Sequence, residues 1–351
     1  NIKDACRAVV AMKPGPVFSA ELLDKKSLAS VNDTTGTGLT AVLTETKADT
    51  PEELQANIEE IKKILSPFET VTPIHFTDKP EEYSKYWAIR SGIFPSVGGT
   101  RRPGTTVLIE DVAFPLKELP EATADLQELL VTNEYHDACI YGHALEGNFH
   151  FIISQSFDSP EQVARYEKLM DEVKTLVVDK YDGSLKAEHG TGRNMAPFVK
   201  YEWGERAYGF MKAVKELFDP KGLLNPGVIF NEDPHCHLKH FKPMPLTNAH
   251  VDKCIECGFC EVNCLTCGFS LSSRQRIVIQ REISRLKKLS DTESSERLKT
   301  LQKQYKYLGN ATCAGDGLCS MSCPMGINVG DLTHDIRQAN LPEKSIGYKT
   351  C

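Results

Sequence analysis

Twelve cysteines carry the most direct chemical signal in this chain of 351 residues. Residues 254 to 264 follow the spacing C-x2-C-x2-C-x3-C, and residues 313 to 323 repeat it with Asp316 in the second ligand position. In this spacing three cysteines wrap one side of a cubane iron-sulfur cluster, and a remote fourth cysteine closes the other side. The two runs therefore predict two clusters and a role in electron transfer.

The repeated spacing also predicts which residues share a cluster. In two-cluster proteins of this kind the fourth cysteine of each run ligates the other cluster. The first cluster is expected on Cys254, Cys257, Cys260 and Cys323, and the second on Cys264, Cys313, Asp316 and Cys319. Because an aspartate oxygen is a harder and weaker iron ligand than a thiolate, the second site is expected to hold either a 4Fe-4S cluster with one labile iron or a 3Fe-4S cluster.

Zinc is the main alternative, since paired CxxC motifs also build zinc knuckles. A structural zinc site uses four ligands, whereas eight positions recur here in two matching groups, with Pro324 after the last. Iron and sulfide are therefore favoured. The clustered spacing also argues against a disulfide framework and favours a reducing compartment. Five cysteines lie outside the pattern and are interpreted as bystanders, with Cys267 an alternative ligand: Cys6, Cys139, Cys236, Cys267 and Cys351.

A second group of residues with metal-ligating side chains lies in the first half of the chain. His143 and His150 flank Gly147, and Glu188 and His189 follow in a glycine-rich motif. Two imidazoles and a remote carboxylate would give a three-ligand metal site with an open position for substrate. An isolated histidine pair near a strand is more often ordinary hydrogen-bonded structure, so the pattern alone leaves both interpretations open.

The elements that must position these residues change in type along the chain. Thr50 and Ser159 are each followed by proline and then by Glu53 or Gln162 at the third position, which predicts helix starts. Strands alternating with helices predict an α+β fold, a ferredoxin-like α/β sandwich. The expected strands are Val17 to Leu23, Leu39 to Glu45, Thr105 to Val112, Ala138 to Tyr141 and Phe149 to Ser154.

The cysteine-rich part carries no strand signal and is expected to form an α-helical ferredoxin domain. Helices are predicted from about residue 274 to 289 and from 292 to 308, the second opened by a Ser290-x-x-Glu293 capping box and ended by Gly309. The predicted domains are residues 1–230 and 249–345, joined by a linker at 231–248. The linker contains His235, Cys236, His237 and His240, which lack a recognised ligand frame.

Composition narrows the classes of partner. The net charge of −7 and the pI near 5.9 argue against a nucleic-acid partner. No apolar stretch approaches the roughly 20 residues that a membrane span needs, and no signal peptide opens the chain. A cytoplasmic protein, or one held peripherally at a membrane, is expected. Because the chain starts at Asn1 without methionine, we expect a fragment of a longer protein.

Four sequence blocks resemble the C-terminal substrate domain of FAD-linked oxidases. They occupy residues 102–115, 142–150, 187–197 and 218–227. With the cysteine runs behind them, the chain resembles the large bacterial-type D-lactate or D-2-hydroxyglutarate dehydrogenases. The resemblance implies a preceding FAD-binding domain that is absent from this sequence and would hold most of the flavin.

The resemblance also implies roles for single residues. His143, His150 and Glu188 match the ligands of a divalent metal, zinc or manganese, His189 matches the catalytic base, and Arg90 aligns with the arginine that grips the substrate carboxylate. The residues that it implies near the flavin are Asn148, Glu188, His189, Gly190 and Asn225.

The implied activity is oxidation of a D-2-hydroxy acid to the 2-oxo acid, with electrons passing from FAD through the clusters to a quinone, cytochrome or electron-transfer protein. Two departures leave the substrate open: Glu146 stands where the family often has aspartate, and Ile109 lies near the place of a substrate-binding lysine. The alternative is a non-catalytic electron-transfer subunit that docks a separate flavoprotein.

Overall fold

The computed structural model describes residues 1–31, 39–241 and 243–341. The chain divides into two compact units, one formed by residues 1–93 and 108–242, the other by residues 94–107 and the chain from 243 onward. The sequence did not indicate that residues 94–107 belong with the cysteine-rich part. Cys351 and the last four residues of the predicted iron-sulfur domain lie outside the described residues.

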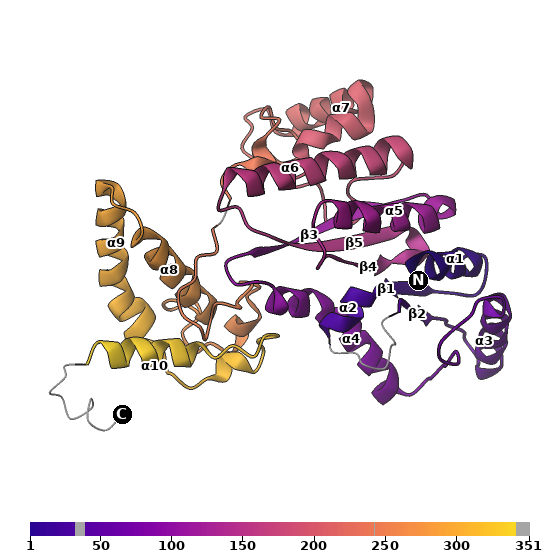
Figure 1. The fold of residues 1–351 in the computed structure, drawn as a ribbon, viewed down its shortest axis with the longest axis horizontal. Coiled ribbons are helices and arrows are strands. Elements are labelled where there is room, and N and C mark those ends of the chain that lie inside the picture. The colour runs from indigo at the N-terminus through magenta and orange to yellow at the C-terminus, as the bar shows by residue number, and fades with distance from the viewer. Residues whose placement is uncertain (32–38, 242, 342–351) are drawn as a thin grey trace. The chain divides into compact units, whose positions relative to one another are not determined.

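An antiparallel sheet of five strands forms the centre of the first unit (Figure 1), as the α+β prediction requires. Its order is β2-β1-β4-β5-β3. Each strand lies within two residues of its expected range at both ends. The strands are β1 (Ser19–Leu23), β2 (Ala41–Glu45), β3 (Thr106–Ala113), β4 (Cys139–His143) and β5 (Asn148–Gln155).

Helices begin where the sequence predicted N-caps. The side chains of Thr50 and Ser159 accept the backbone N–H of Glu53 and Gln162, which satisfies one exposed donor at each helix start. Helices α1, α5 and α6 lie together over one face of the sheet (Figure 1). The helices are α1 (Ile2–Met12), α2 (Lys25–Ser30), α3 (Pro51–Leu65), α4 (Pro80–Thr100), α5 (Leu119–Thr132), α6 (Pro160–Lys174) and α7 (Val199–Phe218).

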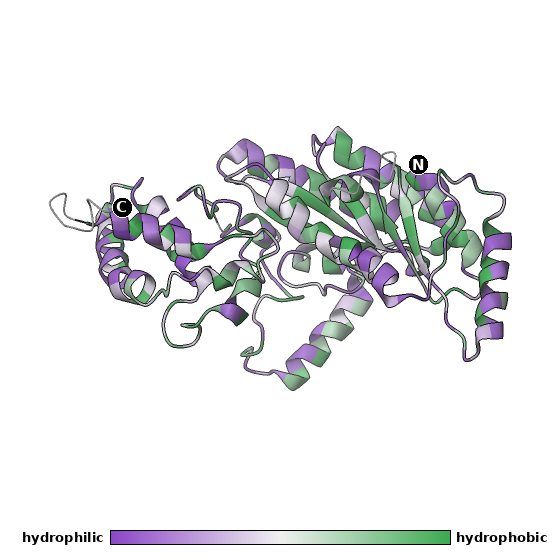
Figure 2. Cartoon of the chain, turned by 90° about the horizontal axis from the view of Figure 1, so that it is seen from below, coloured by the Kyte–Doolittle hydropathy of each residue, from purple (hydrophilic) through white to green (hydrophobic). Residues whose placement is uncertain are grey.

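The hydrophobic core lies between this helical layer and the sheet, and Figure 2 shows hydrophobic residues along the strands. Phe149 and Phe151 of β5 are fully buried there with Leu126 and Leu169 of the helices. Because side chains alternate along a strand, the intervening His150 points to the opposite face of the sheet. Burial of Phe149 and Phe151 in the core therefore leaves His150 on the opposite face of the sheet.

Three helices carry the cysteine-rich unit: α8 (Ser273–Leu286), α9 (Thr292–Tyr305) and α10 (Val329–Ala339). The predicted capping box at Ser290 is wrong, because the N-cap of α9 is Asp291, whose carboxylate accepts the N–H of Ser294. The predicted end at Gly309 is also wrong, since a π-helical turn runs on to Ala311. Gly309 allows close packing instead, because a Cβ there would meet the Tyr305 ring.

Among the described residues, no helix combines the length and the hydrophobicity needed to cross a bilayer.

Candidate functional site

The histidine site lies on the face of the sheet opposite the helical core. His143 ends β4 and His150 lies in β5, where it stands opposite Tyr141 in the strand register. Glu21 of β1 stands opposite His143. Directly opposed residues in an antiparallel pair have neighbouring side chains, so strand pairing alone brings these groups together.

Glu188 completes the group from a loop far along the chain. Its Oε1 lies 3.0 Å from His143 Nε2 and 3.0 Å from His150 Nε2. The three potential ligand atoms all lie within 4.8 Å of one another. The structure therefore brings together the three predicted metal ligands, two imidazole nitrogens and one carboxylate, a donor set that suits zinc or manganese with an open position.

Two further carboxylates stand behind the histidines. Glu21 Oε1 lies 2.5 Å from His143 Nδ1, and Asp111 Oδ1 lies 3.5 Å from His150 Nδ1, which is too long for a strong hydrogen bond. A carboxylate on the far ring nitrogen fixes the tautomer that leaves Nε2 free to bind a metal. The surroundings of both histidines thus fit a bound divalent cation.

Asp111 also shapes the loop that carries Glu188. Its Oδ2 accepts the backbone N–H groups of Ala187, Glu188 and His189 at 2.8 to 2.9 Å. Burial raises the pKa of Asp111, but the adjacent His150 ring and the hydrogen bonds from Asn148 and the loop outweigh it and hold that pKa well below its usual range. Neither Glu21 nor Asp111 was predicted as a site residue from the sequence. The available signal was an acidic residue inside an apolar strand, which burial makes costly without partners.

Both predicted catalytic residues lie at this site. The His189 ring stacks on His150 with centroids 4.5 Å apart, and burial together with the neighbouring His150 lowers the pKa of His189. Arg90 of α4 donates from Nε to Glu21 Oε2 at 2.7 Å, with its guanidinium 4.6 Å from the centre of the Tyr141 ring. Glu21 therefore bridges Arg90 and His143.

The residues expected near the flavin are not all gathered here. The buried Asn148 side chain donates to Asp111 Oδ1 at 2.6 Å, so it supports the carboxylate behind His150. Gly190 follows His189 with a positive φ of 73°. Asn225 lies in the segment after α7, where its carbonyl accepts the backbone N–H of Val228, and among the described residues no hydrogen bond or ion pair joins it to the histidines.

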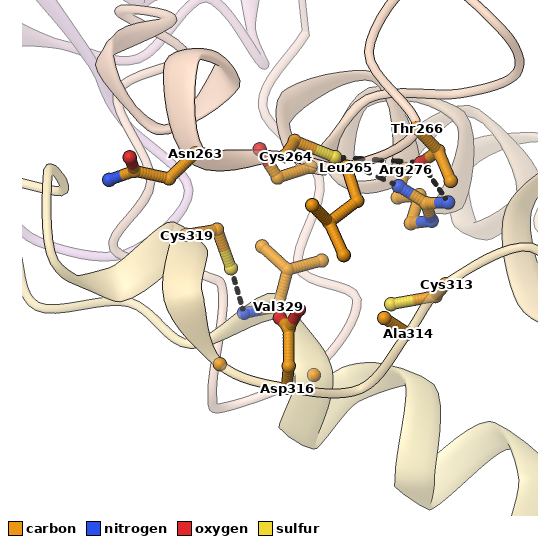
Figure 3. A pocket seen from close by; sticks show the side chains of 13 residues that line it. Asn263, Cys264, Leu265, Thr266, Arg276, Cys313, Ala314, Asp316, Cys319 and Val329 are labelled. Carbon is orange, nitrogen blue, oxygen red and sulfur yellow. Dashed lines mark hydrogen bonds between the residues drawn. The ribbon is translucent and has the colours of Figure 1, made fainter.

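A cavity in the second unit is lined by all four residues predicted for the second cluster (Figure 3). Two sulfur atoms that line the cavity accept hydrogen bonds. Cys319 Sγ accepts from the Val329 backbone N–H at 3.4 Å, and Cys264 Sγ accepts from Arg276 at 3.7 Å. Such N–H donors are typical of cluster ligands, which carry negative charge. The cavity therefore fits an iron-sulfur cluster. The predicted ligands among its lining residues are Cys264, Cys313, Asp316 and Cys319.

Three of the four predicted ligands of the first cluster lie in or against a small apolar core. Cys254 and Cys260 are buried in it and Cys323 packs against it, while Cys257 is exposed. Burial raises the pKa of the Cys254 thiol to about 11, and burial together with neighbouring thiols, Cys323 and Cys257 among them, raises that of Cys260. Cys267 is exposed, outside this core.

The two cysteine runs also repeat in backbone conformation. Gly258 and Gly317 each precede the third ligand position by two residues and have positive φ values of 90° and 72°. A short 3-10 helix follows each glycine, at Phe259–Asn263 and Leu318–Ser320. Positive φ favours glycine, so the repeat that the sequence shows in its ligands extends to the turns that position them.

The histidines of the linker do not form a comparable group. His235 Nδ1 lies 3.5 Å from Glu167, and the thiol of the buried Cys236 donates to the Arg193 carbonyl at 3.3 Å. Among the described residues, the groups with metal-ligating geometry are two overlapping sets that both contain His150, and the second adds Asp111 and His189.

Two different protein families match the histidine-containing part and the cysteine-rich part of the chain. Residues 1–229 match the family described as FAD linked oxidases, C-terminal domain, and residues 250–327 match a 4Fe-4S dicluster domain. The chain belongs to the FAD-linked oxidase family and carries a 4Fe-4S dicluster domain behind the oxidase domain.

Curated relatives are distant and longer. Glycolate oxidase subunit GlcD of Bacillus subtilis is 25% identical over 66% of this chain and 50% of its own length. The mitochondrial D-lactate dehydrogenase [cytochrome] of Arabidopsis thaliana is 29% identical over 67% of this chain and 41% of its own. D-2-hydroxyglutarate dehydrogenase of Stutzerimonas stutzeri is 33% identical over 34% of this chain and 26% of its own. The chain thus spans about half or less of the curated relatives that it matches.

Proposed function

We propose that this chain is the substrate-binding and electron-relay part of a flavin-dependent dehydrogenase of D-2-hydroxy acids, with D-lactate and D-2-hydroxyglutarate as the candidate substrates. The convergence of His143, His150 and Glu188, with His189 stacked beside them, carries this proposal. A module that only docks a flavoprotein would not need these four side chains close together. The relatives named as dehydrogenases of such acids support the substrate class.

Each residue of the site has a task in this reaction. A divalent metal held by the two histidines and Glu188 would polarise the substrate hydroxyl oxygen. His189 lies beside that position and would accept the hydroxyl proton on a ring nitrogen as the C–H bond breaks. Arg90 would bind the substrate carboxylate through a bidentate fork and so orient the C–H bond. Glu21, which pairs with Arg90 and His143, would hold both in place.

The flavin itself would be bound mainly by a domain outside this chain. The match covers between 26% and 50% of the length of the three relatives, and the matched family is a C-terminal domain. Helix α7 supports this proposal, because Phe210, Val214 and Leu217 follow helical spacing on one side and are 71%, 52% and 77% exposed. Apolar side chains that gather on one face of a helix are typical of a surface that another domain covers.

Electrons removed from the acid would leave through the two cysteine-ligated centres, one at a time. We propose Cys254, Cys257, Cys260 and Cys323 as ligands of the first cluster and Cys264, Cys313, Asp316 and Cys319 as ligands of the second. The cavity that the second group lines supports this assignment. The final acceptor would be a quinone, a cytochrome or an electron-transfer protein.

The test is an assay of the full-length protein, joined to its flavin-binding domain, with D-lactate and D-2-hydroxyglutarate. We expect at least one of them to bleach the flavin absorbance and to reduce an artificial acceptor, while the L-enantiomers do neither. Failure of every D-2-hydroxy acid to reduce the flavin, with both clusters intact by iron and sulfide analysis, would refute the dehydrogenase and favour the electron-transfer subunit.

A further inference from the structure

Arg276 of α8 is a buried cation beside the cavity of the second cluster. Its residue exposure is 1%, and it is among the largest fully buried side chains of the chain. Arginine is almost never fully buried unless its charge is paired. Among the residues that the structure describes, however, no carboxylate forms a salt bridge with Arg276. A buried unpaired guanidinium is costly, so an anionic group should lie next to it.

The guanidinium is fixed in one orientation. Its Nε donates to the Gly309 carbonyl at 2.6 Å, and its Nη2 donates to the hydroxyls of Thr266 and Thr312 at 2.9 and 3.1 Å. These neutral acceptors hold the planar fork but do not balance its charge. The remaining nitrogen, Nη1, points to Cys264 Sγ at 3.7 Å (Figure 3). The fold therefore aims one charged donor at one sulfur that lines the cavity.

The first group of cysteines has a different environment. Arg281 is also buried there, but its Nη1 forms a 2.6 Å ion pair with Glu256 Oε1. Its Nη2 reaches the Cys254 carbonyl oxygen at 2.9 Å, a backbone atom and not a sulfur. Among the described residues, an arginine therefore donates to a predicted ligand sulfur at the second centre and not at the first.

We propose that Arg276 is a positioning residue that raises the reduction potential of the second cluster through its charged hydrogen bond to the Cys264 sulfur. Reduction adds one negative charge to a cluster, and hydrogen bonds to its sulfurs and nearby positive charge stabilise the reduced state. Burial strengthens the effect, because little water screens the charge. This inference rests on the proposed assignment of Cys264 to the second cluster.

A redox titration followed by electron paramagnetic resonance tests this inference in the full-length protein. Cys257→Ser and Cys313→Ser variants assign the signals to the first and second cluster, and they test the ligand assignment separately. We expect Arg276→Met to shift the second cluster to a lower potential and to leave the first unchanged. Arg285→Met is the matched control, since it removes the same charge from the same helix but from a partly exposed pair with Glu282.

Arg276→Lys keeps the charge and loses the fork, so its potential should lie between those of the wild type and Arg276→Met. If Arg276→Met does not assemble the second cluster, the lysine variant decides: a lowered potential of that cluster alone supports the proposal. An unchanged potential in the variants that assemble, an equal shift of both clusters, or an equal shift in Arg285→Met would overturn it. Loss of the cluster in Arg276→Lys as well would overturn it too, because the role would then be structural.

Discussion

The buried charges around the histidine site are mainly acidic, whereas those around the cysteine turns are mainly basic. Glu21 and Asp111 are 3% and 0% exposed behind the histidines, while Arg276 and Arg281 are 1% and 4% exposed near the cysteines. A divalent cation is stabilised by carboxylates behind its ligands. A cluster with four anionic ligands is stabilised by donors and positive charge. Each unit thus buries charges of the sign opposite to that of the group that we propose it holds.

Both units limit the free-energy cost of buried charge by pairing or hydrogen bonding it. Glu21 pairs with Arg90 and Arg281 pairs with Glu256, both in partly or fully buried ion pairs. Asp111 relies on backbone N–H groups instead, and Arg276 on neutral oxygens and one sulfur. Among the described residues, both groups lie next to a proposed ligand: Asp111 is 3.5 Å from His150 Nδ1, and Arg276 is 3.7 Å from Cys264 Sγ. We infer that the bound groups complete their environment.

The largest effect, loss of the metal and of turnover, is expected at the histidine site. His150→Ala removes one of two imidazole ligands, so the full-length protein should lose its divalent metal and its oxidation of D-2-hydroxy acids, because two remaining ligands do not make a stable site. Metal analysis by mass spectrometry and steady-state turnover measure this. His235→Ala, a histidine of the linker, should change neither. Full metal content and turnover in His150→Ala would show that His150 is not a metal ligand.

Removing the carboxylate partner of Arg281, near the cysteine turns, should have the next largest effect. Glu256→Gln leaves Arg281 buried without its carboxylate, and breaking one side of a buried pair costs about 3–5 kcal/mol. The free energy of unfolding, measured with denaturant while the cluster absorbance is followed, should fall by about that amount. Glu282→Gln is the control, because its pairs with the partly exposed Arg285 and the exposed Arg297 should contribute about 1 kcal/mol or less. Equal losses would contradict the distinction.

A smaller effect is expected from the carboxylate behind His150. Asp111→Asn keeps the shape but loses the negative charge, and such changes typically weaken metal binding by about 10- to 100-fold. Competition with a chelator measures the affinity, and iron content should stay the same. Asp125→Asn removes a carboxylate that pairs with Lys180 outside the site and should leave the affinity unchanged. An unchanged affinity in Asp111→Asn would show that the acidic surroundings do not act on the metal.

The smallest effect is expected at the weak ligand of the second cluster. Asp316→Cys replaces an oxygen with a softer thiolate, so the fourth iron should be lost more slowly under a mild oxidant. The rate at which the 3Fe-4S resonance signal develops measures this. Asp335→Cys adds the same thiol on the exposed side of α10 and should not change the rate. Faster loss of iron in Asp316→Cys than in the wild type would exclude Asp316 as a ligand.

The sequence predicted the fold class and the local elements well. Strand alternation and helix caps are short-range signals, and both Thr50 and Ser159 cap helices as expected. The error at Ser290 has a local cause, since Asp291 offers an equally good cap one residue later. The prediction that Gly309 ends the helix was wrong because this glycine allows close packing against the Tyr305 ring instead.

The two cysteine turns could be predicted from the sequence, because the local backbone brings together ligands that are three residues apart. The sequence also named His143, His150 and Glu188 through resemblance. The charged residues that contact the proposed ligands became visible in the folded chain and not in the sequence. Glu21 reaches His143 through strand pairing, and Arg276 reaches Cys264 from a helix. Such contacts depend on which faces of distant elements are buried in the core. The spacing of residues along the sequence does not show this.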